Sequence, residues 1–201
     1  MSTAKRLNQQ PGLHGWAWAA RARFGRGLPT LWLFTDTHRL PDPLPAIGRL
    51  PRGLAGVVLR HDDHPDRAAI GRQIARICRV RRLTLVVAGD VRLAAALGAG
   101  VHLRGGRWPG PIRTRGPHTS SAHDAAELTR ARLAGASLAF LSPAFPTASH
   151  PGAPALGPAR WSRLAGAARL PVAALGGITA RDVRRLSPRA CRGAAAIGAL
   201  A

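Results

Sequence analysis

Short apolar runs alternate with longer stretches rich in Ala, Arg and Leu from residue 31 onward. This alternation is typical of βα units around a parallel sheet, because each buried strand needs a crossover to reach its parallel neighbour. Eight strands in this order favour a closed barrel over an open sheet. The predicted strands span residues 31–35, 56–60, 83–88, 99–103, 137–142, 171–175 and 192–197, with a weaker eighth candidate at 118–123.

The stretches between the strands predict the outer helices. The segment 104–117 is too rich in glycine and proline to form a regular helix. We therefore expect a reduced helix after the fourth strand and, because the sequence stops soon after the last strand, a truncated final helix. The predicted helices span residues 66–80, 91–97, 124–133, 159–168 and 180–186.

Together these elements predict an α/β fold, a small (β/α)₈ TIM barrel over residues 28–201. A chain of 201 residues with 46% hydrophobic content suits one domain with one core. Residues 1–27 form a basic N-terminal arm with five cationic residues and no acidic one. The arm is mobile or loosely docked, and it either covers the end of the barrel or is disordered. Its Trp16 and Trp18 would otherwise serve as a partner-docking or lid element.

The formal net charge is +21, and Lys5 is the only lysine among the 30 basic residues. Such a charge attracts phosphorylated metabolites, nucleic acid or anionic membrane surfaces. The arginines are spread along the chain and no nucleic-acid-binding module is present, so a basic enzyme surface is favoured over nucleic-acid binding. Cys78 and Cys191 lack companions at metal-ligand spacing, which indicates two buried thiols.

The sequence contains no apolar stretch of the ~18 residues that a membrane helix needs, and no apolar run of the signal-peptide type near its start. We therefore expect a cytoplasmic location and no membrane partner. The oligomeric state is left open, with a homo-oligomer among the alternatives.

A phosphate site is predicted at the end of the barrel where the strands finish. In closed βα barrels the chemistry lies at the C-terminal ends of the strands, and the loops after the last two strands often hold a phosphate. The seventh strand runs into Gly176-Gly177, and the eighth ends at Ile197-Gly198. Glycine lets backbone N–H groups approach phosphate oxygens without a Cβ in the way.

The other strand ends supply polar side chains for the same rim. His123 follows the fifth strand, and we interpret it as a general acid or base because histidine titrates near neutral pH. Its alternative role is that of a loop or helix-capping residue. The remaining rim candidates are Asp36, Arg60, Asp90, Ser121, Thr147, Ser149 and His150.

Five motifs resemble, in order and spacing, the strand-end motifs of the thiamine-phosphate synthase and TenI family. The resemblance covers about residues 31–198, and the proline-threonine loop followed by Gly-Gly-Ile is its most specific part. The motifs are Leu31-Trp32-Leu33-Phe34-Thr35-Asp36, Gly100-Val101-His102-Leu103, Ser121-Ala122-His123, Leu141-Ser142-Pro143-Ala144-Phe145-Pro146-Thr147 and Ala174-Leu175-Gly176-Gly177-Ile178.

The resemblance implies small phosphorylated thiazole or pyrimidine metabolites as ligands. Synthases of the family join a pyrimidine pyrophosphate to a thiazole phosphate with Mg²⁺, and the TenI branch aromatises a thiazole phosphate carboxylate by moving a proton. By position, His123 matches the histidine implicated in that proton transfer, and Asp90 would be one Mg²⁺ ligand. The implied binding residues are Gly176, Gly177, Ile197 and Gly198 for the thiazole phosphate, Thr147 beside the thiazole, and Arg60 and Ser121 facing pyrophosphate.

The chain departs from the synthase pattern mainly in the pyrophosphate half of the site. Asp62 stands where synthases have a lysine, and His150 replaces the lysine after the sixth strand. The run from Arg104 to Arg107 replaces Gly-Gln-Asp-Asp and removes the second acidic metal ligand. Its two arginines would place positive charge where the metal would have been.

These departures favour TenI-like proton transfer over Mg²⁺-dependent synthesis. One carboxylate binds Mg²⁺ poorly unless substrate phosphates supply most of the ligands. The alternatives are a full thiamine-phosphate synthase and a non-catalytic barrel that binds a phosphometabolite or a partner. Electrostatic binding of nucleic acid is the least supported function, since only the charge favours it.

Overall fold

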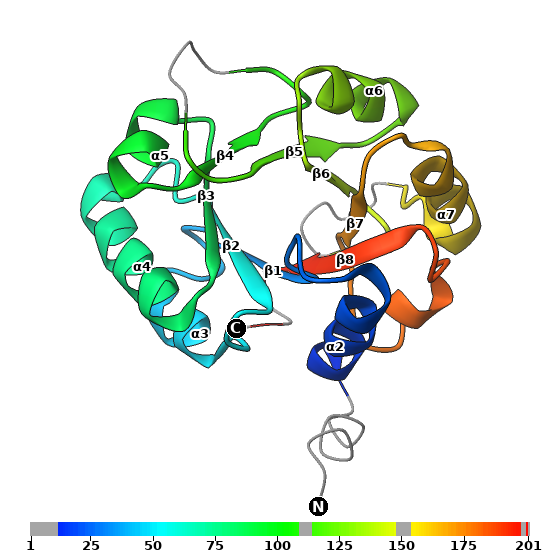
Figure 1. Cartoon of the computed structure of the whole chain (residues 1–201), viewed down its shortest axis with the longest axis horizontal. Helices are drawn as coiled ribbons and strands as arrows, with labels where there is room; N and C mark the ends of the chain where they lie inside the picture. Colours follow the sequence, from blue (N-terminus) through cyan, green and yellow to red (C-terminus); the bar gives the residue numbers. More distant parts are fainter. Residues whose placement is uncertain (1–11, 109–113, 148–153, 198–199, 201) are drawn as a thin grey trace, which may run out of the picture.

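Eight parallel strands close into a barrel that is surrounded by helices (Figure 1). The computed structural model describes residues 12–108, 114–147, 154–197 and 200. Each strand pairs with the next in sequence, and β8 pairs with β1 to close the barrel, which confirms the predicted fold. The strands are β1 (Leu31–Phe34), β2 (Ala55–Leu59), β3 (Thr84–Ala88), β4 (Gly100–Leu103), β5 (His118–Ala122), β6 (Leu138–Leu141), β7 (Val172–Leu175) and β8 (Cys191–Ala196).

The predicted helices are confirmed in four of five places, and no described residue after β4 and before β5 is helical. The predicted helix at 180–186 is wrong, because only the 3₁₀ turn η1 forms before Pro188, which disfavours helical backbone at the residue preceding it. The truncated final helix falls on residues outside those described. The helices are α2 (Leu13–Phe24), α3 (Leu44–Arg49), α4 (Arg67–Arg81), α5 (Val91–Leu97), α6 (Ala125–Leu133) and α7 (Gly157–Ala167), with η1 at Val183–Arg185.

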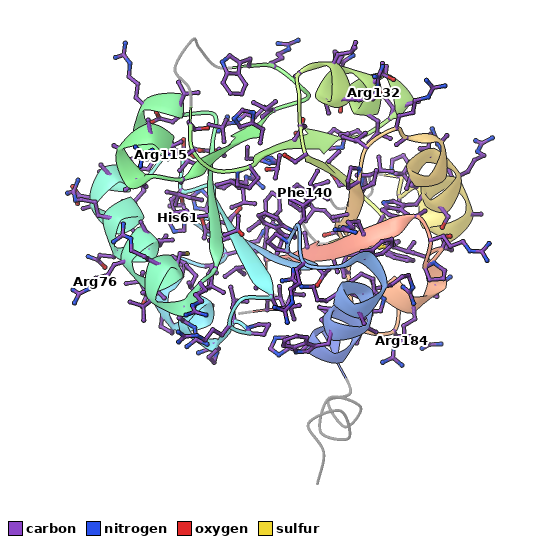
Figure 2. The ribbon with its side chains drawn as sticks, in the orientation of Figure 1. His61, Arg76, Arg115, Arg132, Phe140 and Arg184 are labelled. Atoms are coloured by element: carbon purple, nitrogen blue, oxygen red, sulfur yellow. The ribbon has the colours of Figure 1, made fainter. Side chains whose placement is uncertain are left out.

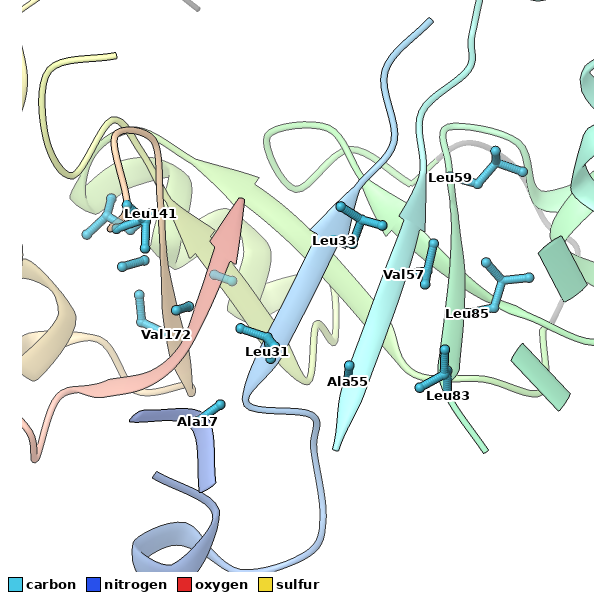
Figure 3. Close-up of a cluster of buried hydrophobic side chains, with 14 of the residues drawn as sticks. Ala17, Leu31, Leu33, Ala55, Val57, Leu59, Leu83, Leu85, Leu141 and Val172 are labelled. Carbon is cyan, nitrogen blue, oxygen red and sulfur yellow. The ribbon is translucent and has the colours of Figure 1, made fainter. Parts of the chain in front are cut away.

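The side chains of each strand alternate between the helices outside and the barrel interior. On β1 and β2, Leu31, Leu33 and Val57 belong to the large apolar cluster between the sheet and the helices (Figure 3). Trp32 and Phe34, in the alternate positions of β1, belong to a second cluster in the interior. The alternation therefore decides which residues beyond each strand end face the mouth of the barrel.

Three large aromatic rings fill much of the interior. Phe140 meets both Trp32 and Phe34 edge-to-face, with ring centroids 5.3 and 4.8 Å apart. Gly56 is required on the neighbouring strand, because a Cβ there would lie 2.5 Å from the Trp32 ring. Alanines such as Ala173 on β7 leave room for the rings. The rings make the interior a packed core, and Phe34 forms part of the floor of the pocket described below.

The N-terminal helix α2 is docked on the barrel. Ala17 is fully buried, and Thr30, just before β1, donates a hydrogen bond from Oγ1 to the Ala17 carbonyl at 2.8 Å. Arg192 donates to the Phe24 carbonyl at 2.8 Å and lies over its ring, 4.8 Å from the centroid. Because these partners lie where β1 and β8 begin, α2 cannot act as a lid over the strand ends. Residues 1–11 lie outside the described part.

Cys78 and Cys191 are buried and form no disulfide, as predicted. Burial raises the pKa of both thiols to about 12. They are therefore protonated and unreactive at neutral pH.

Among the described residues, no helix has the length and apolar character needed to cross a membrane.

Candidate functional site

A pocket of about 630 Å³ opens at the C-terminal ends of the strands. Side chains two positions apart on a strand share a face. The residue two positions after the last inward-facing side chain of a strand therefore faces the mouth of the barrel and contributes to the pocket wall. The pocket is lined by Phe34, Asp36, Arg39, Arg60, Asp62, Ala88, His102, Arg104, Ser121, His123, Ser142, Pro143, Thr147, Pro154, Leu175, Gly176 and Ile197.

The pocket brings together seven of the predicted site residues. They come from the ends of five different strands and from the loop after β6. Two predicted residues, Gly177 and Asp90, do not line it, and Ser149, His150 and Gly198 lie outside the described residues. The seven that line it are Asp36, Arg60, Ser121, His123, Thr147, Gly176 and Ile197.

His123 follows β5 and is held by two hydrogen bonds. Its Nδ1 lies 2.8 Å from the Ser142 carbonyl, which can only accept, so Nδ1 carries the proton and donates it. Its backbone N–H donates to Glu127 Oε2 at 2.8 Å, while Asp124 caps the start of α6. The bonded Nδ1–H leaves Nε2 as the nitrogen with a lone pair in the neutral ring. His123 therefore presents one defined tautomer to the pocket.

The paired glycines after β7 allow two loops to pack closely. Gly176 and Gly177 have φ of 89° and 63°, values that favour glycine. A Cβ on Gly177 would lie 2.7 Å from the Phe145 carbonyl oxygen, in the loop after β6. Phe145 N–H also donates to the Gly176 carbonyl at 3.1 Å. The glycines thus join the β6 and β7 loops, and Gly176 contributes to the pocket wall; that they hold a phosphate stays a prediction.

Two carboxylates near the ends of β2 and β3 are engaged by arginines. Asp62 accepts from Arg67 Nη2 at 3.0 Å and from Arg104 Nη2 at 2.6 Å. Asp90 caps α5 by accepting the Leu93 N–H at 2.9 Å, and its other oxygen lies 3.5 Å from Arg67 Nη1. Arg67 therefore sits between the two carboxylates.

These residues do not fit a Mg²⁺ ion. Magnesium needs octahedral oxygen ligands at short distance, commonly including one or two free carboxylates. Both carboxylates here already hold guanidinium groups, and Asp90, which caps α5, does not line the pocket. In the described ranges, no three His, Cys, Asp or Glu side chains gather as a metal site. We derive no step through a bound metal.

His102 on β4 lies on the pocket floor and was not predicted as a site residue. It is 3% exposed, and its Nδ1 lies 3.0 Å from Thr119 Oγ1. Burial, with Arg60 and Arg104 nearby, lowers the pKa of His102 to about 3, so the ring is neutral at physiological pH. His102 and Arg104 are two positions apart and so lie on the same, inward-facing side of β4. This alternation is the sequence signal that could have identified His102 as a site residue.

A second buried histidine supports the β1 and β2 ends. Thr35 Oγ1 accepts the Arg60 N–H at 2.9 Å and lies 2.9 Å from His61 Nδ1. His61 Nε2 lies 3.4 Å from the Pro41 carbonyl, which can only accept, so in the neutral ring Nε2 carries the proton and Nδ1 accepts from the Thr35 hydroxyl. Burial lowers the pKa of His61. This neutral contact fixes the backbone from which Arg60 reaches the pocket.

The pocket carries more positive than negative side chains. Among the described residues its cations are Arg39, Arg60 and Arg104, and its carboxylates are Asp36 and Asp62. Burial alone would raise the pKa of Asp36, but N–H groups of Arg39 and His38 and the charges of Arg39 and Arg60 hold it below its ordinary value. With both carboxylates bonded internally, the pocket favours an anionic ligand.

Solved structures with a similar fold include two thiamine phosphate pyrophosphorylases. The chain is 24% identical to a thiamine phosphate pyrophosphorylase from Pyrococcus furiosus, with a TM-score of 0.70 over 84% of this chain and 85% of that one. It is 18% identical to a thiamine phosphate pyrophosphorylase from Bacteroides thetaiotaomicron, with a TM-score of 0.60 over 86% and 84%. FabK from Thermotoga maritima, 11% identical, has a TM-score of 0.64 over 86% of this chain and 58% of its own. At these identities the likeness shows the fold alone.

Sequence comparison adds the family. No match was found among curated proteins. The family model described as thiamine monophosphate synthase matches residues 46–200, a span that includes β2 to β8 and most of the pocket wall. The chain therefore belongs to the thiamine monophosphate synthase and TenI family.

Proposed function

We propose that this protein aromatises a thiazole phosphate carboxylate by moving a proton, as the TenI branch of its family does. The family match and the barrel support a thiamine-biosynthesis enzyme of this general kind. The observation that carries the finer proposal is the geometry of His123. Its Nδ1–H is fixed on the Ser142 carbonyl, so the lone pair of Nε2 is available to a ligand in the pocket.

The proton transfer requires a base that can also return the proton. In the proposed reaction Nε2 of His123 takes a proton from one atom of the thiazole ring system and delivers it to another. While His123 is an imidazolium, the Ser142 carbonyl stabilises the charge through the Nδ1–H bond. The net result is a rearranged thiazole with no proton gained or lost.

The pocket also offers a way to orient the two anionic ends of such a ligand. Gly176 and Ile197 lie on the β7 and β8 side, where barrels of this kind often hold a phosphate. Arg60 and Arg104, at the ends of β2 and β4, would face the carboxylate. A ligand held at both ends would present its ring to His123 between them.

The experiment measures aromatisation and synthesis separately. Purified protein is incubated with thiazole phosphate carboxylate, and the aromatic product is followed by proton NMR. We expect turnover without Mg²⁺, and His123→Ala to lower the rate by about 10²–10⁴-fold, the usual contribution of a general base, with ligand affinity retained. His14→Asn, on α2, is the control and should leave the rate unchanged.

Three outcomes would contradict the proposal in different ways. Robust Mg²⁺-dependent formation of thiamine phosphate from the two precursors would favour the synthase. Ligand binding with neither activity would favour a non-catalytic phosphometabolite-binding barrel. Full aromatisation by His123→Ala would remove His123 from the chemistry.

A further inference from the structure

We propose that Arg67 and Arg104 together take the place of a divalent cation, so that the pocket binds phosphorylated ligands without metal. This inference concerns binding, and it holds whether or not the protein turns the ligand over. Asp62 and Asp90 are paired with arginines, whereas Mg²⁺ would need their oxygens free as ligands.

Arg67, at the start of α4, is the inner member of the pair. Its side chain is 18% exposed, and Nη2 donates both to Asp62 at 3.0 Å and to the Ala88 carbonyl at 2.7 Å. Its Nη1 faces Asp90 at 3.5 Å. A cation that contacts two carboxylates and a backbone carbonyl has oxygen partners of the kinds that a divalent ion would use.

Arg104, at the end of β4, is the outer member. It is bonded to Asp62 at 2.6 Å, yet its side chain is 59% exposed and lines the pocket. A guanidinium has five N–H donors in a planar fork, and among the described residues the ion pair of Arg104 with Asp62 engages Nη2 alone. The remaining donors are available to a phosphate or carboxylate in the pocket, and Asp62 fixes the direction in which they point.

The charges balance as they would with one metal ion. Asp62 and Asp90 carry two negative charges, which Arg67 and Arg104 neutralise with two positive ones. A Mg²⁺ ion would have to displace both guanidinium groups, leaving Arg67 with part of its charge buried and unpaired, which is costly. The arginines therefore both supply the positive charge and exclude the ion.

The test uses inorganic phosphate as the probe, titrated by calorimetry into the full chain with EDTA or with excess MgCl₂ at equal ionic strength. We expect the two affinities to agree within about twofold. Arg104→Gln should weaken phosphate binding about tenfold, the scale of one lost charge-assisted hydrogen bond. The matched control Arg115→Gln, between β4 and β5 but outside the pocket wall, should change the affinity by less than about twofold because its charge is exposed.

Metal binding is measured directly with Mn²⁺, a spectroscopic substitute for Mg²⁺, by electron paramagnetic resonance. We expect the unaltered protein to bind no stoichiometric Mn²⁺, and Arg67→Gln, which frees Asp62 and Asp90, to acquire a site. Stoichiometric Mn²⁺ in the unaltered protein would overturn the proposal. So would a gain of tenfold or more in phosphate affinity on adding Mg²⁺, or no phosphate binding in either buffer.

Two features keep these results decisive. Arg104 and Arg115 are exposed, so their variants should fold even if Arg67→Gln does not. Failure of the aromatisation assay alone contradicts the proposed reaction and leaves metal-free binding intact, whereas Mg²⁺-dependent phosphate binding contradicts only the present inference.

Discussion

Gly177 illustrates how one residue can satisfy the family pattern for a reason other than ligand contact. Its φ of 63° and its approach to the carbonyls of Phe145 and Pro146 demand glycine, although it does not line the pocket. Gly176 beside it also has a positive φ and lines the pocket as well. The glycine pair can therefore be required for the loop geometry as well as for a phosphate.

Gly177→Ala should destabilise the protein by roughly 2 kcal/mol or more, since backbone strain at positive φ and a steric clash add. The control is Gly166→Ala in α7, where a Cβ meets nothing within 4 Å; it should be neutral or stabilising by up to about 1 kcal/mol. Urea unfolding of both variants makes the measurement. Equal stability of the two would show that the loops move apart readily.

His102 gives stability a dependence on pH. Its pKa is about 3 in the folded protein against an ordinary value of 6.5, so below about pH 6.5 the unfolded chain binds a proton that the folded chain does not. The unfolding free energy should fall as the pH drops from about 7.5 to about 5, by up to about 2 kcal/mol from this group. The lowered pKa of His61 acts in the same direction. The fall in unfolding free energy between these pH values should therefore be smaller, but not absent, in His102→Asn. If the variant showed the same pH dependence as the unaltered protein, His102 would not be its source.

At the scale of elements, strands were easier to predict than helices. Seven of the eight strands are short apolar runs, which their burial requires whatever their neighbours. The eighth, β5, is mostly polar (His118–Ala122) and was therefore only a weaker candidate. The helix α3 was missed because Pro43 and Pro45 suggest a loop, although proline is tolerated in a first helical turn. A helix was predicted at 180–186 from the local residue pattern, which does not include the effect of Pro188. Only the 3₁₀ turn η1 forms before that proline.

The candidate site follows the same logic. Residues such as Arg60, Ser121 and Ile197 continue the inward alternation of their strands, so their place in the pocket follows from the strands alone. Asp90 comes after a turn, and its direction is set by capping α5, which strand alternation does not reveal. The arginine partners of Asp62 and Asp90 depend on contacts between separate loops and were only partly anticipated, through Arg104.

The helix α2 should contribute to stability as a packed element. Ala17 is fully buried against the barrel and Ala19 is exposed on the same helix. Ala17→Asp should therefore lower the unfolding free energy by about 3 kcal/mol, because it buries an unpaired charge, while Ala19→Asp should change it by less than about 0.5 kcal/mol. Thermal unfolding compares the two. Equal melting temperatures would mean that α2 is docked too weakly to matter.

At the scale of the whole molecule, the positive charge is distributed around the barrel. Figure 2 shows Arg76, Arg132 and Arg184 pointing outward from different elements, on α4, α6 and η1. A nucleic-acid-binding protein usually concentrates its cations along one face. Charge spread in this way acts mainly through mutual repulsion in the folded state, which salt screens.

The net charge of +21 should make stability increase with ionic strength. Raising NaCl from about 0.05 to about 0.5 M shortens the Debye length from above 10 Å to below 8 Å, so the melting temperature should rise by several degrees. The triple variant Arg76→Gln, Arg132→Gln and Arg184→Gln removes three exposed charges for which no ion pair is seen in the described residues. It should melt higher than the unaltered protein at low salt and respond less to added salt. A melting temperature that falls with salt would mean instead that ion pairs such as Arg67–Asp62 outweigh the repulsion among the surface arginines.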